Sequence, residues 1–113
     1  MTIEIANVTK NAMLDALGID KVGLHSGATG ADGLANELSS VSYVRTPCVF
    51  RTAVNGERAL AADVIFNLGS GDTVSYVSYW SGMTFVLSQS TEPAAFTTNG
   101  RFTLASTTTV LRL

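Results

Sequence analysis

The sequence is divided unevenly between one short helical segment and a long series of β-type runs. Residues 7–17 have the apolar spacing of a helix, whereas residues 21–113 contain short runs of β-branched and aromatic residues separated by Gly, Asn and Asp. Short strands at intervals of roughly ten residues are typical of a β-sandwich or jelly roll. The sequence therefore predicts one mainly β domain over residues 1–113, an antiparallel sandwich of about seven or eight strands with an N-terminal α-helix.

The predicted helix begins at Asn7, a suitable N-cap residue. Met13, Leu14 and Leu17 fall on one face, and Gly18 can end the helix in a left-handed conformation. A helix this short is marginal in isolation. We therefore expect its apolar face to cover an edge or a face of the sheet.

Turn residues and prolines divide the β-type part of the chain. Asn55-Gly56 is the strongest hairpin signal, because both central positions of a type I′ turn need positive φ. Pro47 implies an edge position, a bulge or a break within its run, and Pro93 predicts an interruption. Residues 57–62 are compatible with a brief helix but are too few to decide. The predicted strands cover residues 21–26, 43–53, 64–68, 74–80, 84–90, 96–98, 102–104 and 107–113.

The composition predicts a protein that makes assembly contacts. Charged residues are only 14% of the chain, against about 25% in typical domains, and 46% are hydrophobic. A monomer with this composition risks exposing apolar patches, so we expect a homo-oligomer or a larger assembly. The net charge is −2 and the basic residues are scattered, which argues against nucleic-acid binding. No apolar run approaches the ~18 residues of a membrane span, so we expect no membrane partner.

Few residues have the chemistry of a catalytic or metal site. His25 is the one histidine, and its predicted position on the polar side of a strand favours a structural or interface role over acid–base catalysis. Cys48 stands alone, which excludes an intrachain disulfide and a Cys-based zinc site and favours a buried position. We expect no catalytic residue, cofactor or metal, since no calcium-loop pattern connects the carboxylates Asp32, Glu37, Asp63 and Asp72.

A glycine-rich segment, residues 27–36, follows the first predicted strand. Gly27, Gly30 and Gly33 share the spacing of a phosphate-binding loop, but no helix opening and no Lys-Ser/Thr ending follow. We interpret the segment as a flexible arm or tight loop that reaches outward.

Tyr76, Tyr79 and Trp80 form the one aromatic cluster of the sequence. Strand alternation places Tyr76 and Trp80 on one face and Tyr79 on the other, so at least one face belongs to the core. Core packing is the favoured interpretation, and a carbohydrate-binding module that stacks a sugar on these rings is the alternative.

Five segments in this order resemble those of a known family of small proteins. They are NAMLDAL at 11–17, VGLH at 22–25 leading into a glycine-rich loop that ends with NE at 36–37, SYVR at 42–45, VIF at 64–66 and VSYVSYW at 74–80. The family is encoded among the structural genes of tailed bacteriophages and is described as tail-fibre, minor tail or head-decoration proteins. The chain departs from it at Ser81-Gly82, where the family carries a longer glycine-rich turn.

The resemblance implies a non-enzymatic virion protein that assembles in multiple copies on the particle exterior. Its partners are then the major capsid protein or tail proteins. Head decoration is favoured, because the chain is compact and lacks a coiled-coil or collagen-like shaft. The alternative is a tail-fibre or minor tail protein that contacts the host surface, including a host glycan.

Two segments are expected to make outward or intersubunit contacts. The N-terminus lacks the features of a secretion signal, so we expect synthesis in the host cytoplasm and localisation on the virion. The expected contact residues are Met1, Thr2, Ile3, Glu4 and Ile5, together with Gly27, Ala28, Thr29, Gly30, Ala31, Asp32, Gly33 and Leu34.

Overall fold

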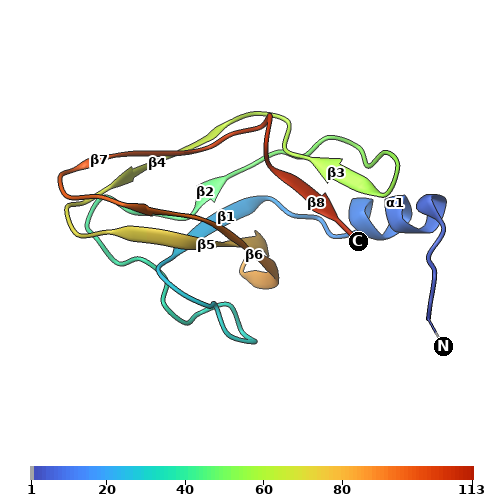
Figure 1. The fold of residues 1–113 in the computed structure, drawn as a ribbon, viewed down its shortest axis with the longest axis horizontal. Coiled ribbons are helices and arrows are strands. Elements are labelled where there is room, and N and C mark those ends of the chain that lie inside the picture. Colours follow the sequence, from blue (N-terminus) through green and yellow to red (C-terminus); the bar gives the residue numbers. More distant parts are fainter. Residues whose placement is uncertain (1) are drawn as a thin grey trace.

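A computed structural model describes residues 2–113 and confirms a mainly β fold with one N-terminal helix. Over this range the chain forms one helix and eight strands, and every strand pair is antiparallel (Figure 1). The elements are α1 (Asn7–Asp15), β1 (Lys21–His25), β2 (Thr46–Pro47), β3 (Glu57–Ala59), β4 (Val64–Leu68), β5 (Thr73–Ser81), β6 (Thr84–Ala95), β7 (Gly100–Leu104) and β8 (Val110–Arg112).

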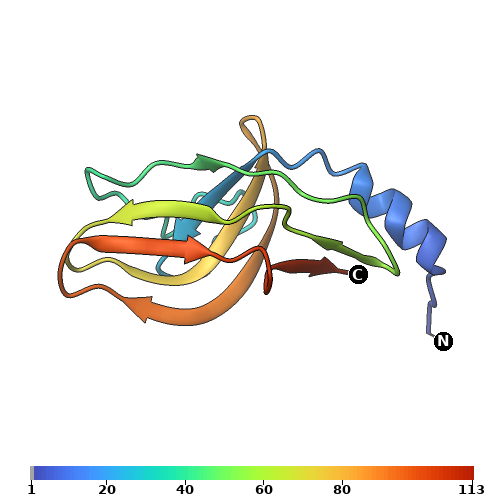
Figure 2. The same cartoon turned by 90° about the horizontal axis from the view of Figure 1, so that it is seen from above.

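The strands form two layers compatible with a β-sandwich. One layer is the sheet β2-β1-β5-β6, and the other holds the pairs β3-β8 and β4-β7. Figure 1 shows these layers one above the other, and Figure 2 shows α1 at one end of an elongated molecule of 46 × 29 × 25 Å. The layers meet on one side, where β2 contacts β4. On the opposite side β6, β7 and β8 are each the last strand of their sheet.

The core lies between the layers, and strand alternation directs side chains into it. In β4, Val64, Phe66 and Leu68 are buried while Ile65 and Asn67 are exposed, which is the period of a half-buried strand. Each large apolar side chain buried in this way contributes about 1.5–3 kcal/mol. The fully buried apolar side chains that complete the core are Leu14, Val22, Leu24, Leu60, Val74, Val77 and Tyr79.

The predicted helix is correct in place and wrong in its ends. It stops at Asp15 instead of residue 17, and Ala6 occupies the N-cap position without a side-chain cap hydrogen bond, so Asn7 is the first helical residue. Leu14 is the buried residue of the helix, whereas Met13 is 45% exposed. Only part of the expected apolar face is therefore buried.

The helix packs against the edge strand β3 and the hairpin turn that precedes it, as one of the two expected arrangements. Asn11 Oδ1 accepts the Gly56 N–H at 2.8 Å, and Asp15 Oδ1 accepts the Ala53 N–H at 2.8 Å. The turn is the predicted one, with φ of 54° at Asn55 and 76° at Gly56. Polar side chains thus satisfy backbone donors of the hairpin, and this fixes α1 at the end of the sandwich.

Two strand predictions are wrong, and the structure decides one segment that the sequence left open. The run at 43–53 contributes only β2, which lies at the edge of its sheet as Pro47 allows. Residues 57–59 form β3 instead of a helix, because they pair with β8. Residues 96–98 form no strand and belong to the connection from β6 to β7.

Pro93 does not interrupt β6 as predicted. The β5–β6 register shifts between the pairs Val74–Ala94 and Tyr76–Ser90, so Pro93 lies within a bulge. A bulge leaves residues without ladder partners, and the missing N–H of proline therefore removes no hydrogen bond there.

Candidate functional site

A buried chain of hydrogen bonds lies on the side of β1 and β5 that faces away from the core. Antiparallel pairing places Gly23 opposite Ser78. Trp80 Nε1 donates to Ser78 Oγ at 2.8 Å, Ser78 Oγ lies 2.8 Å from His25 Nε2, and His25 Nδ1 lies 2.8 Å from the Ala35 carbonyl oxygen. Because a carbonyl only accepts, Nδ1 is assigned the proton, and Nε2 accepts from the serine hydroxyl.

The pair His25–Ser78 has the spacing of a base and a nucleophile but no access for a substrate. Both residues are 0% exposed. The polar side of the strand that carries His25 is buried, because residues 26–45 cover it. Since every polar atom of the pair is engaged within the protein, this geometry connects the loop to the sheet.

An ion pair completes this polar network. Arg45 donates two hydrogen bonds to the Glu37 carboxylate, both at 2.8 Å, and Tyr43 donates to the same carboxylate at 2.6 Å while accepting the Leu24 N–H. Burial alone would raise the pKa of Glu37, but the hydrogen bonds from Arg45 and Tyr43 outweigh it and lower that pKa. Burial and the bond to Glu37 raise the pKa of Tyr43 above its ordinary value. The Arg45 guanidinium stacks on Trp80, 3.6 Å from the ring centroid.

The aromatic cluster offers no open platform for a sugar. Tyr79 is 0% exposed, and its hydroxyl donates to Gln89 Oε1 at 2.7 Å. Trp80 is 3% exposed, with Arg45 on its face and Phe85 in an edge contact at 5.5 Å. Tyr76 is half-buried on the same side of the sheet as Trp80. Core packing of Tyr79 is therefore confirmed, and the buried rings of Tyr79 and Trp80 cannot stack on a glycan.

The glycine-rich segment is a tight, hydrogen-bonded loop. The Ala35 N–H donates to the Thr29 carbonyl at 3.0 Å, and the Leu34 N–H donates to Asp32 Oδ1 at 3.0 Å. Gly33 has φ of 76°, and a Cβ there would collide with the Phe85 ring, so this position needs glycine.

The loop positions differ in exposure. Thr29 and Gly33 are buried and cannot make the expected outward contacts, and Gly27 is half-buried. Leu34 is the one large apolar side chain of the loop on the surface, at 58% exposure. The other exposed positions among the expected contact residues of this loop are Ala28, Gly30, Ala31 and Asp32.

The other expected contact segment is exposed along its length. Met1 lies outside the described residues, and Thr2, Ile3, Glu4 and Ile5 are all exposed. No backbone hydrogen bond ties residues 2–5 to the remainder of the described chain. Figures 1 and 2 show this segment leaving α1 at the end of the molecule. We call residues 2–6 the arm.

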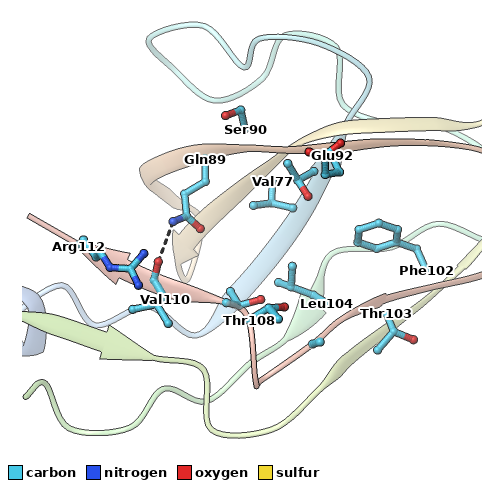
Figure 3. Close-up of a pocket in the computed structure, with 13 residues that line it drawn as sticks. Val77, Gln89, Ser90, Glu92, Phe102, Thr103, Leu104, Thr108, Val110 and Arg112 are labelled. Carbon is cyan, nitrogen blue, oxygen red and sulfur yellow. Dashed lines mark hydrogen bonds between the residues drawn. The ribbon is translucent and has the colours of Figure 1, made fainter.

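A cavity of about 410 Å³ opens where the two layers are not joined (Figure 3). We call this junction between β6 on one side and β7 and β8 on the other the seam. Its apolar residues are Val77, Phe102, Leu104 and Val110. Gln89 Nε2 donates to the Val110 carbonyl at 3.0 Å across it. The polar residues around it include Ser90, Thr91, Glu92, Thr103, Thr108 and Arg112.

The sequence did not predict the seam, because its residues come from strands that alternation alone cannot place side by side. In the sequence, the residues of the seam appear only as members of separate segments. Their meeting depends on the order of strands in each sheet.

The described residues hold no cluster of three or more His, Cys, Asp or Glu side chains able to bind a metal. The four carboxylates considered above have separate partners, such as the Gly69 N–H for Asp72 and the Ser106 N–H for Asp63. Cys48 is buried as predicted, and burial raises its pKa to about 11. No helix in residues 2–113 has the length and apolar character needed to cross a bilayer.

No protein-family model, curated protein sequence or solved structure matches this chain. The resemblance to bacteriophage structural proteins therefore stays a prediction.

Proposed function

We propose that the chain is a non-enzymatic structural protein of a tailed-bacteriophage virion, where it assembles in multiple copies on the exterior as head decoration. The observation that carries the proposal is the number of large apolar side chains on the surface of a charge-poor domain. On a surface with few charges, these side chains offer apolar area that an assembly can cover. They include Ile3, Val8, Val41, Val44, Val49, Val54 and Met83, each more than half exposed.

The resemblance to phage structural proteins supplies the location on the particle. Its segments lie in one order between residues 11 and 80, and they include both the loop before Asn36 and most of the strand β5. The buried state of His25 and Ser78 supports a non-enzymatic role, since the one base–nucleophile pair described above is closed to substrates.

Head decoration requires many weak contacts instead of one strong site. A specific contact of roughly 800 Å² per partner suffices when it is repeated around a shell, because multivalency multiplies the effect of each contact. The exposed Leu34 supplies an apolar group for contacts with the major capsid protein. Contacts of this kind would add buried area across neighbouring capsid subunits.

The proposal is tested by counting the chain against the major capsid protein in purified particles of the phage that encodes it. We expect quantitative mass spectrometry to give a ratio near one per capsid subunit, with antibody label over the shell. A few copies confined to the tail would instead establish the tail-fibre or minor tail alternative. Absence of the chain from purified particles would refute a virion role.

Deletion of residues 1–5 gives a second test. Because residues 2–5 have no backbone hydrogen bonds to the described chain, the truncated protein should keep its melting temperature. Its incorporation into particles should fall, since the exposed Ile3 and Ile5 are removed. Normal incorporation of the truncated chain would exclude the arm as a contact.

A further inference from the structure

The arm has the pattern of a β-strand without a partner. In Thr2-Ile3-Glu4-Ile5-Ala6, apolar and polar residues alternate, so Ile3 and Ile5 share one face of an extended segment. Ile3 is 84% and Ile5 38% exposed. Ala6 is extended, with φ −62° and ψ 146°, and leads the arm away from the helix.

The seam has the complementary features. The strands β6, β7 and β8 each end their sheets, so each has one edge without a neighbouring strand. Residues 84–91 of β6 contain no charged side chain, and the charge and proline that usually protect an exposed edge occur in β6 only at Glu92 and Pro93, at the bulge. Phe102 and Val110 remain half-exposed in the cavity because no strand covers them.

We propose that the arm of one copy of this chain binds in the seam of a second copy as an added β-strand. Ile3 and Ile5 then lie against Phe102, Leu104 and Val110, and Thr2 and Glu4 face the solvent. Backbone groups of the arm pair with the free edges beside the cavity, and this is the mode by which extended peptides add to sheets. This contact between copies would help to build the proposed multi-copy assembly, and the inference rests on the proposed function only for that role.

Charge favours one position for Glu4 along the seam. Figure 3 shows Glu92 and Arg112 at opposite ends of the seam. The Arg112 side chain is 66% exposed and has one ion-pair contact, to Glu57 at 3.3 Å. Beside Arg112 the Glu4 carboxylate would gain an oppositely charged neighbour, whereas beside Glu92 it would meet a second carboxylate.

Sedimentation of the purified full chain tests the association. We expect a concentration-dependent dimer or larger species, and Ile3→Asp should raise its dissociation constant at least about tenfold, because an apolar contact is replaced by a charge. The matched control is Ser39→Asp, which adds the same charge at an exposed residue outside the arm and the seam. The circular dichroism of both variants should equal that of the parent chain.

Disulfide trapping tests the position. An Ile5→Cys chain is mixed with a tagged Thr108→Cys chain, and we expect a mixed disulfide in high yield; the native Cys48 is buried and does not compete. The control mixes Ile5→Cys with Ser39→Cys, an exposed position outside the arm and the seam. Equal yields in both mixtures, or a chain that stays monomeric at every concentration, would overturn the proposal. Because the assay uses isolated protein, its failure is distinguishable from failure of the particle count.

Discussion

Replacing Arg45 by Met should uncouple the loop of residues 26–45 from the sheet beneath it. The methionine retains most of the aliphatic contact with Trp80 but loses both hydrogen bonds to Glu37. The Glu37 carboxylate then keeps only the hydrogen bond from Tyr43 and stays partly desolvated. The substitution therefore tests whether the polar network stabilises the fold.

The magnitude follows from the geometry of the ion pair. A hydrogen bond to a charged group contributes about 1.5–3 kcal/mol when it is well buried. The Arg45 and Glu37 side chains are 27% and 18% exposed, so solvent screening reduces the value of the pair. With about 0.5–1 kcal/mol for stacking on Trp80, we expect the free energy of unfolding to fall by about 2–3 kcal/mol. For a domain of this size the melting temperature should fall by about 10 °C.

Urea unfolding followed by fluorescence measures this change, and the single Trp80 lies within the network. The matched control is Arg101→Met, which makes the same substitution at an exposed residue of β7 and should change stability by less than about 0.5 kcal/mol. Glu37→Gln should cost less in the Arg45→Met background than in the parent chain, because its partner is already absent. An unchanged unfolding midpoint in Arg45→Met would refute the stabilising role of the ion pair.

Three further predictions concern acid stability, packing and thiol reactivity. Folding lowers the pKa of Glu37. The Glu37 carboxylate therefore contributes fully to stability above its unfolded pKa of about 4.3, and this contribution is lost as the pH falls through the folded pKa. Urea unfolding midpoints measured from pH 7 to pH 3 should fall less in Glu37→Gln than in the parent chain. Gly23→Ala should lower the free energy of unfolding by about 1–3 kcal/mol, because a Cβ there would lie 2.6 Å from Ser78 Oγ. Calorimetry measures the change, and Gly69→Ala, whose added Cβ has its nearest contact at 3.4 Å, is the control. Cys48, with a pKa raised to about 11, should react with a disulfide reagent at pH 8 at least about tenfold more slowly in the native protein than in urea; equal rates would show that the thiol is accessible.

Several features of the fold follow from the sequence because they depend on neighbouring residues. The alternation of Val64, Phe66 and Leu68 predicts a strand with one buried face, since side chains alternate along any strand. The Asn55-Gly56 turn and the left-handed Gly18 follow from the φ angles that these residues tolerate. The mainly β class and the N-terminal helix are the sum of such local preferences.

Other features depend on which strands pair with each other, and local sequence patterns do not determine that pairing. The hydrogen bond between His25 and Ser78 joins residues 53 positions apart, and it exists because β1 pairs with β5. The loop of residues 26–45 covers this face and buries a histidine that local alternation places on a polar side. The bulge at Pro93 likewise depends on the β5–β6 register.

The seam is the clearest case of a feature that tertiary structure alone decides. Its residues belong to β5, β6, β7 and β8, and the cavity exists because the two layers join through β2 and β4 but not through β6 and β7. The sequence by itself determined an alternating, apolar arm that needs a partner. Only the fold determined where unpaired strand edges and half-exposed apolar groups meet, because strand order is set by packing of the whole chain.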